Sequence, residues 1–102
     1  MIDRKSLRAG DEVWVVNTGY YSGDAYAHVT GGTVVAAGED GSFVYRTNAG
    51  RVENVQAWLY GTVVATEAEA WMAAASALAS LAARVADKAA ECRAKAEVEV
   101  TA

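Results

Sequence analysis

Proline is absent from this 102-residue chain, cysteine and histidine each occur once, and all nine glycines fall at or before Gly61. One cysteine cannot form an intramolecular disulfide, and with a single histidine it cannot complete a zinc site. No apolar run approaches the roughly 20 residues that cross a bilayer, and no signal-peptide segment follows Met1. We therefore expect a cytoplasmic protein that its core alone holds together, without metal, cofactor or membrane contact.

Alanine accounts for much of the apolar content of this chain. The sequence is 53% apolar with a net charge of −4, a composition that excludes intrinsic disorder. Of its 23 alanines, 14 lie between Glu67 and Glu97, whereas the glycines punctuate the part before them. This division predicts one α+β domain, with strands in the first part and a helix in the second.

Short runs rich in β-branched and aromatic residues alternate with glycine turns before residue 66. The predicted strands cover residues 12–17, 25–30, 33–37, 42–47, 51–55 and 57–65. Residues 18–24 are expected to form an irregular loop, and Gly31-Gly32 a hairpin or a bulge. Five or six strands at this spacing predict a small antiparallel barrel or a bent sheet over residues 1–65.

The sequence after the strands predicts one long helix. Thr66-Glu67-Ala68-Glu69 has the form of a capping box, and neither glycine nor proline interrupts residues 67–97. The predicted helical segment is therefore 66–97, about 46 Å long, and residues 98–102 are expected to be a frayed tail.

Large and small apolar residues alternate along this helix at intervals of four and three, which is the pattern of a packed helix face. The residues predicted for self-association are Trp71, Ala75, Leu78, Leu81, Ala82, Val85, Ala89 and Cys92. A barrel of some 60 residues is only about 25 Å across. Either the front half of the helix docks on the barrel and the rear half projects, or the whole helix pairs with another copy. We expect a homo-oligomer, most simply a dimer.

The segment Leu7 to Val16, followed by Gly32-Thr33-Val34-Val35, resembles the opening of KOW-type and related SH3-like barrels. SH3-like domains hold extended, proline-rich peptides with an aromatic and acidic loop. Tyr20, Tyr21, Asp24 and Tyr26, near Trp14, resemble that loop and are the predicted partner-binding residues. The alternative is that two of these aromatic side chains fill the core of the barrel.

Charge disfavours the nucleic-acid binding that a KOW-type resemblance would imply. Residues 1–62 carry five basic and seven acidic side chains, and residues 63–102 carry four and six. Phosphate contacts need clustered lysine and arginine, and the only basic cluster, formed by Arg4, Lys5 and Arg8, is expected to be a solvated arm. A KOW-like nucleic-acid-binding domain is therefore the second hypothesis.

The motifs of an enzyme are also missing. No phosphate loop or metal-ligand spacing occurs. Ser22, Asp24 and His28 are close in sequence, but a triad is recognised by geometry and not by proximity in sequence. Cys92 is expected to be a buried, inert thiol. We expect no catalytic residues, and a small-ligand-binding or catalytic barrel is the third hypothesis.

An aromatic strand, Trp58-Leu59-Tyr60, precedes the capping box and the alanine-rich helix. In outline this arrangement looks like that of small accessory proteins of phages and mobile elements. The resemblance implies stoichiometric binding of a host or phage protein, for example inhibition of a bacterial defence complex as by an anti-CRISPR protein. The first hypothesis is therefore a non-enzymatic protein-binding module that oligomerises through its helix.

Overall fold

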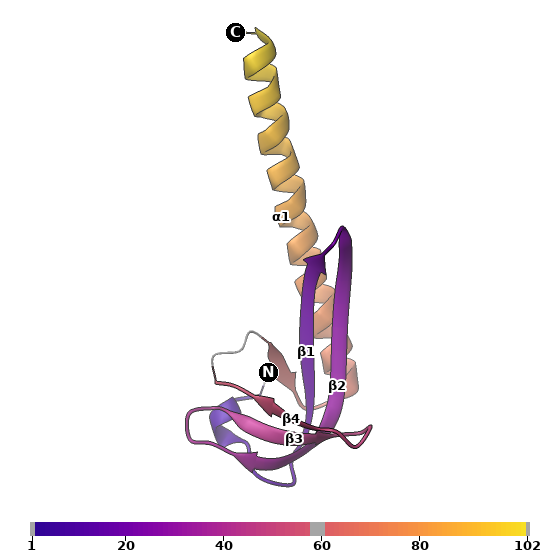
Figure 1. Ribbon diagram of the computed structural model, residues 1–102, viewed down its shortest axis with the longest axis vertical. Helices are drawn as coiled ribbons and strands as arrows, with labels where there is room; N and C mark the ends of the chain where they lie inside the picture. Colours follow the sequence, from indigo (N-terminus) through magenta and orange to yellow (C-terminus); the bar gives the residue numbers. More distant parts are fainter. Residues whose placement is uncertain (1, 58–60, 102) are drawn as a thin grey trace.

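The computed structural model describes residues 2–57 and 61–101, so the predicted strand segment Trp58-Leu59-Tyr60 lies outside the described residues. Five strands and a long helix follow a short 3-10 helix, η1 (Arg4–Ser6). The strands are β1 (Glu12–Tyr21), β2 (Asp24–Ala37), β3 (Phe43–Thr47), β4 (Val52–Val55) and β5 (Thr62–Val64), and the helix is α1 (Glu67–Thr101). Figure 1 shows α1 rising from the sheet along the long axis of the molecule.

All strand pairs are antiparallel, in the order β4-β3-β2-β1-β5. The predicted α+β class is confirmed. Of the two predicted arrangements the sheet is the open one, because the edge strands β4 and β5 do not pair in the described part of the chain. A closed barrel is therefore wrong for this fold.

The first two strands are longer than the sequence predicted. The predicted loop over residues 18–24 is wrong, because β1 continues to Tyr21 and pairs with β2 along its whole length. The glycine hairpin at Gly31-Gly32 is also wrong. Both glycines lie inside β2, where Gly31 is opposite Trp14 and Gly32 is opposite Val13. The predicted bulge instead lies between Val34 and Ala36, where the pairing with β3 shifts.

The sheet carries a separate apolar cluster on each face. The main core gathers buried residues from the first segment and from four strands, namely Leu7, Val13, Val15, Val34, Phe43, Tyr45 and Val63. On the other face Val16 and Val64 pack with Ala70 and Ala74 of α1. Phe43, Tyr45 and Thr47, which alternate along β3 and so share one face of the strand, are all buried. The larger core therefore forms without the helix.

The helix begins at the predicted capping box. The Glu69 amide donates to Thr66 Oγ1 at 3.2 Å, and the Thr66 hydroxyl donates to Glu69 Oε1 at the same distance. At its far end α1 continues to Thr101, so the predicted frayed tail over residues 98–102 is wrong. Every side chain from residue 82 to residue 98 is exposed, so no described part of the chain covers the rear half of the helix.

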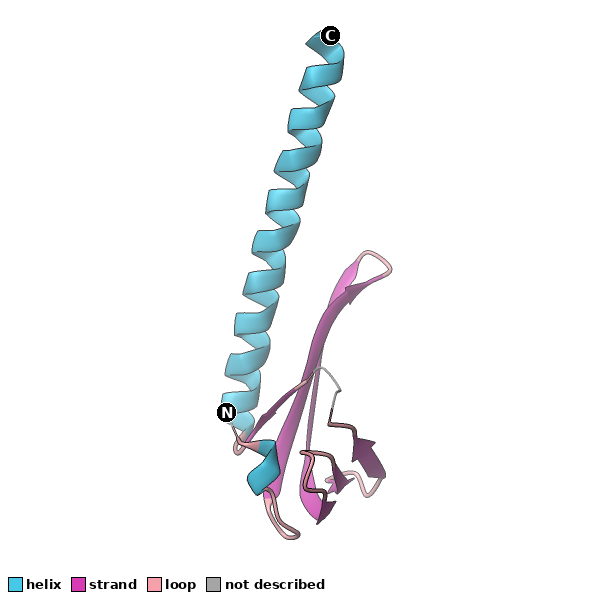
Figure 2. Cartoon of the chain, turned by 90° about the vertical axis from the view of Figure 1, so that its left-hand side faces the viewer, coloured by secondary structure: helices cyan, strands magenta, loops and turns pink. Residues whose placement is uncertain are grey.

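Of the two arrangements predicted for the helix, the front half docks and the rear half projects (Figure 2). Ala70 and Ala74 are buried against β1 and β5, and Ala77 and Leu81 are half-buried on the same side of the helix. The radius of gyration is 18.3 Å, against about 13 Å for a compact domain of this length. The projecting helix accounts for this elongation. No helix in the described residues is long and apolar enough to cross a membrane.

Candidate protein-binding surface

The paired strands β1 and β2 extend beyond the rest of the sheet as a two-stranded hairpin (Figure 1). On one side β5 pairs only with Trp14–Val16, and on the other β3 pairs only with Gly32–Ala37. Within the described strands, the outer edges at residues 17–21 of β1 and 24–31 of β2 have no strand partner. In Figure 2 the hairpin leans away from α1 towards its tip.

A two-residue turn closes the hairpin. Ser22 and Gly23 both have positive φ angles, 52° and 80°, which is the conformation of a type I′ turn. This turn matches the twist of the flanking strands and brings Tyr21 directly opposite Asp24. Ser-Gly is a weak form of the usual Asn-Gly turn signal, and the two glycines that flank Tyr20-Tyr21-Ser22 favour an irregular loop by composition alone.

The structure brings the four predicted partner-binding residues to the hairpin tip. Tyr20, Tyr21, Asp24 and Tyr26 border one shallow depression, together with Ala25 and His28, and we call this set the hairpin surface. Tyr21 is 77% exposed, Tyr20 58% and Tyr26 39%. The alternative that two of the four aromatic side chains, Trp14 included, fill the core is therefore wrong, because all three tyrosines are exposed. Trp14, by contrast, is half-buried beside the cluster under α1.

The pleat divides the hairpin surface between the two faces of the sheet. Directly opposed residues share a face, so Tyr21, Asp24, Tyr26 and His28 lie on the concave face, away from α1. Tyr20 lies on the face that α1 covers further down. The hairpin surface is thus a two-sided tip rather than a single flat patch.

Neighbouring groups hold the Tyr26 ring in place. It lies across Gly19, its partner on β1, so closely that a methyl group at Gly19 would be 2.6 Å from the Tyr26 hydroxyl oxygen. Its centroid is 5.2 Å from that of the His28 ring, at an interplanar angle of 41°. Tyr26 is therefore an exposed but ordered aromatic side chain, which suits a binding surface because little side-chain entropy is lost on contact.

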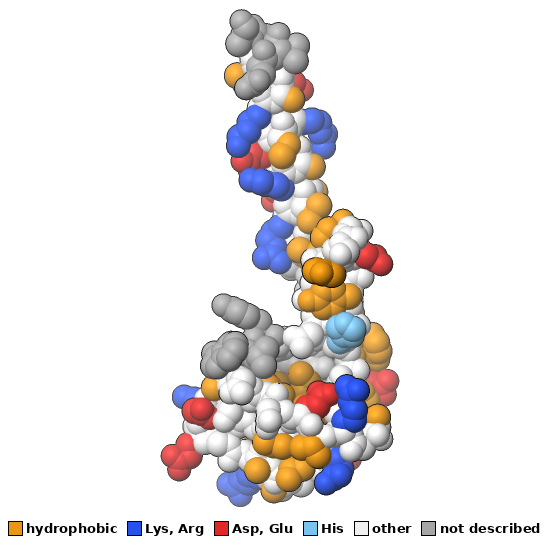
Figure 3. Space-filling view, viewed as in Figure 1, with side chains coloured by type: hydrophobic (Ala, Val, Ile, Leu, Met, Phe, Trp, Pro, Cys, Tyr) orange, Lys and Arg blue, Asp and Glu red, His pale blue; other side chains and the backbone are white. Residues whose placement is uncertain are grey.

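The concave face continues from His28 into a hollow of about 120 Å³ at the base of the hairpin. Its lining combines polar and apolar side chains and comes from the segment before β1 and from all five strands and their flanks. The lining residues are Arg4, Val15, Asn17, His28, Thr30, Tyr45, Glu53, Asn54, Val55, Gly61 and Val63. In Figure 3 the chain's single histidine lies between apolar side chains of the hairpin and charged side chains at its base.

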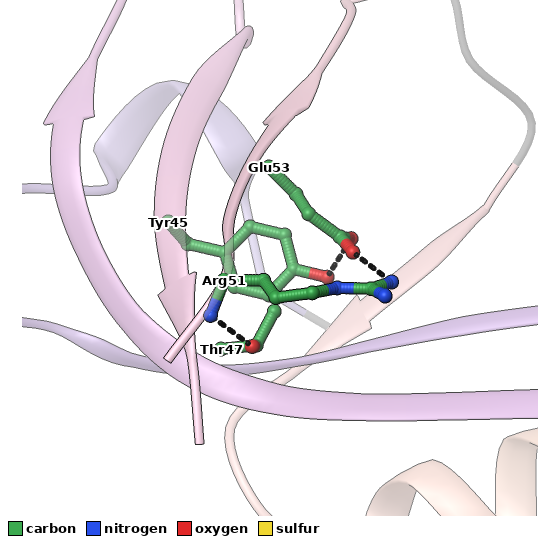
Figure 4. A network of polar contacts seen from close by, with 4 residues as sticks. All are labelled: Tyr45, Thr47, Arg51 and Glu53. Atoms are coloured by element: carbon green, nitrogen blue, oxygen red, sulfur yellow. Dashed lines mark hydrogen bonds and ion pairs between the residues drawn. The ribbon is translucent and has the colours of Figure 1, made fainter. Parts of the chain in front are cut away.

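Two residues that line this hollow, Tyr45 and Glu53, belong to a polar network with Thr47 and Arg51 (Figure 4). The buried Tyr45 hydroxyl donates to Glu53 Oε2 at 3.2 Å, and Arg51 forms an ion pair with Glu53 Oε1 at 3.2 Å. The Arg51 amide donates to Thr47 Oγ1 at 3.0 Å, which fixes the turn between β3 and β4. Burial, and then the negative charge of Glu53, raise the pKa of Tyr45 to about 12.

The sequence did not reveal this network. Tyr45 meets Glu53 because the two residues are opposed in the β3–β4 register. The only signal in the sequence was the eight-residue separation across the Asn48-Ala49-Gly50 turn. His28, which borders both the hairpin surface and the hollow, was likewise not among the predicted partner-binding residues.

The geometry excludes a triad of Ser22, Asp24 and His28. Asp24 and His28 are four residues apart on one strand, about 13 Å at the usual rise per residue, and the Tyr26 ring lies between them. No group of three or more potential metal ligands occurs among the described residues. Cys92, predicted to be buried, is exposed within this chain.

The N-terminal basic cluster is not a free arm. Arg4 donates from Nε to the Gly41 carbonyl at 3.1 Å and from Nη2 to the Gln56 carbonyl at 2.5 Å. Its guanidinium lies 5.7 Å from the centroid of the Phe43 ring. Arg4 therefore ties η1 to the sheet, and the cluster has one cation fewer to offer to phosphate groups.

The predicted self-association residues follow one strip of α1, except for Leu81, which lies on the side that faces the sheet. Trp71 and Val85 are about half exposed, Leu78 and Leu81 are half-buried, and Cys92 is exposed together with the alanines Ala75, Ala82 and Ala89. The structure places these residues on the helix without a second copy to cover them.

No protein-family model, curated protein or solved structure matches this chain. The functional argument therefore depends on the surfaces described above.

Proposed function

We propose that this chain is a non-enzymatic protein-binding module that presents its β1–β2 hairpin to a protein partner and self-associates through α1. The observation that carries the proposal is the hairpin surface, where Tyr20, Tyr21 and Tyr26 stand exposed at the end of a projecting hairpin. Tyrosine offers a large rigid contact area with a polar tip, and it is enriched in binding surfaces for that reason.

The free edges of the hairpin favour an extended partner segment. Residues 17–21 and 24–31 offer backbone donors and acceptors without a neighbouring strand. A partner segment that adds as a strand would gain main-chain hydrogen bonds, while alternate side chains meet Tyr26 and His28. We therefore propose strand addition as the binding mode, in place of the binding of proline-rich peptides that the SH3-like resemblance implied.

The helix supports the second part of the proposal. An isolated helix is marginal in water even when it is rich in alanine. The rear half of α1 nevertheless carries an apolar strip that no described part of the chain covers. A second copy would cover this strip and stabilise the projecting helix.

The wider role proposed for the chain is that of a small accessory protein of a phage or mobile element, acting by occupying a surface of a host complex such as a bacterial defence complex. This role is the one implied by the resemblance to small phage and mobile-element proteins. It is consistent with candidate binding surfaces that are apolar and aromatic.

Capture from bacterial lysate, with identification by mass spectrometry, tests the hairpin. The double variant Tyr20→Ser, Tyr21→Ser should capture at least tenfold less of the partner protein than wild type does. The matched control is Val35→Ser, Val52→Ser, which removes two exposed apolar side chains elsewhere on the sheet. Equal capture by wild type and the tyrosine variant would exclude the hairpin surface. Salt-sensitive binding of DNA or RNA at micromolar affinity would favour the nucleic-acid hypothesis instead.

A further inference from the structure

We infer that two copies of this chain pair their α1 helices antiparallel, as a two-fold symmetric homodimer with one defined register. This inference rests on the self-association proposed above and adds the orientation and the facing residues. The partner that covers the apolar strip of α1 is a second copy of this chain. Three observations favour this partner: the position of the strip, its alternation of large and small residues, and the charges beside it.

The apolar strip is distinct from the helix face that docks on the sheet. Ala70, Ala74, Ala77 and Leu81 face the sheet. In the docked half the residues of the strip each follow one of these four by one position, a rotation of about 100° around the helix, and the strip continues at intervals of three and four into the projecting half. We call this strip the seam, and it consists of Trp71, Ala75, Leu78, Ala82, Val85, Ala89, Cys92 and Ala96. The seam therefore runs past the docked half and along the projecting half without interruption.

The exposed area of the chain is large enough for such an interface. Its accessible surface is 7182 Å², whereas a compact monomer of 10.7 kDa exposes about 5,500 Å². The excess of about 1,700 Å² is roughly twice the 800 Å² that each partner buries in a standard interface. A helix pair can thus use surface that a compact monomer would not expose.

The alternation of residue sizes selects the antiparallel orientation. In a parallel pair equal positions face each other, so layers of alanine alone would alternate with layers of two large residues. In an antiparallel pair each layer combines one alanine with one larger residue, which keeps the helix separation constant. In one register every layer matches: Ala96 faces the partner's Trp71, Cys92 the partner's Ala75, Ala89 the partner's Leu78, and Val85 the partner's Ala82.

The charges beside the seam favour the same orientation. In the rear half the positions that flank the seam hold Ala86 and three basic residues, Lys88, Arg93 and Lys95, of which Lys88 and Lys95 also form ion pairs with Glu91 on the same helix. A parallel pair would set Lys88 against the partner's Arg93, with like charges in contact. In the antiparallel register these cations lie along the partner's front half, where the only charged residues of the helix, Glu67 and Glu69, are acidic.

Cysteine crosslinking in the full chain tests the orientation, with oxidised glutathione as the oxidant. In the proposed register Cys92 lies beside the partner's residue 75, and the two Cys92 residues are about 25 Å apart. The variant Ala75→Cys should therefore form disulfide-linked dimers, whereas wild type should not. The matched control is Ala89→Cys, whose new thiols face each other in a parallel pair but lie about 16 Å apart here.

The outcomes separate this inference from the proposed function. Disulfide-linked dimers of Ala75→Cys alone, joined between residues 75 and 92 by mass spectrometry, would support the antiparallel register. Crosslinking of wild type through Cys92, or of Ala89→Cys through residue 89, would overturn the orientation while leaving self-association intact. A dimer by light scattering that none of the three proteins traps would also overturn the register. A monomer at tens of micromolar would overturn both proposals.

Discussion

Gly31 lies directly opposite Trp14 in the β1–β2 ladder, and the indole ring covers it. A methyl group at Gly31 would come within 2.6 Å of Trp14 Cη2, closer than non-bonded carbon atoms approach. The glycine thus provides the space in which the ring packs across the strand, next to the cluster that anchors α1. Aromatic rings that cover cross-strand glycines are a known way of stabilising twisted sheets.

The substitution Gly31→Ala is therefore expected to destabilise the fold by about 1–3 kcal/mol through overpacking. The measurement is the free energy of unfolding in urea. In a Trp14→Ala background the same change should be neutral, or stabilising by about 0.5 kcal/mol, because alanine is less costly than glycine inside a strand. If Gly31→Ala lowered the free energy of unfolding equally with and without the Trp14 ring, the ring would not be the cause of the destabilisation.

Stability is expected to fall between pH 10 and pH 12 because of Tyr45. Its pKa is about 12 in the folded state, above the ordinary value of 10.0. A group whose pKa is raised by folding stabilises the protein fully below its unfolded pKa and loses that contribution as the pH rises through the folded value. The expected loss is about 2–3 kcal/mol. The variant Tyr45→Phe should lack this component, so the comparison removes the effect of other groups that titrate in the same range.

Removing the negative charge of Glu53 should lower the pKa of Tyr45 without returning it to 10.0. Burial is the largest cause of the raised pKa and is unchanged in Glu53→Gln, whereas the charge of Glu53 is the second cause. Spectrophotometric titration of the tyrosines measures this shift. A pKa for Tyr45 unchanged in Glu53→Gln would mean that the 3.2 Å hydrogen bond to the carboxylate does not form in solution.

Loss of the helix cap should weaken the junction between the sheet and α1. Replacing Thr66 with alanine removes the acceptor of the Glu69 amide and is expected to cost about 1 kcal/mol. Replacing Thr66 with serine keeps a hydroxyl group and should cost at most a few tenths of a kcal/mol of folding stability. Chemical denaturation followed by circular dichroism measures both variants, and an equal loss in the two would point to the methyl group rather than to the cap.

The unfolding temperature is expected to rise with protein concentration, because a dimer gains about 1.4 kcal/mol for each tenfold increase. Val85→Glu places a charge on the seam and should abolish this dependence. Ala83→Glu, on the other side of the helix, should retain it. Because both residues are exposed within the single chain, a loss of the dependence in Val85→Glu alone identifies the seam as the interface.

Local sequence signals were sufficient for the elements whose causes are local. The capping box placed the start of α1 because the Thr66 hydroxyl and the Glu69 amide are three residues apart. Period-two alternation places Phe43, Tyr45 and Thr47 on one face of a strand, because successive side chains point to opposite faces, and the structure buries that face. The alternating strip of α1 followed in the same way from the 3.6-residue helical repeat.

Tertiary contacts decided what depended on residues far apart in sequence. Gly31-Gly32 has the composition of a turn, yet it lies within β2 because Trp14 and Tyr45 occupy the space above it. Glu53 lies beside Tyr45 only because of the strand register. Which helix face meets the sheet depended on Val16 and Val64, since periodicity makes several alanine-rich faces equivalent. Periodicity within the chain thus set the elements and the composition of their faces, whereas packing between distant residues chose which face each element buries.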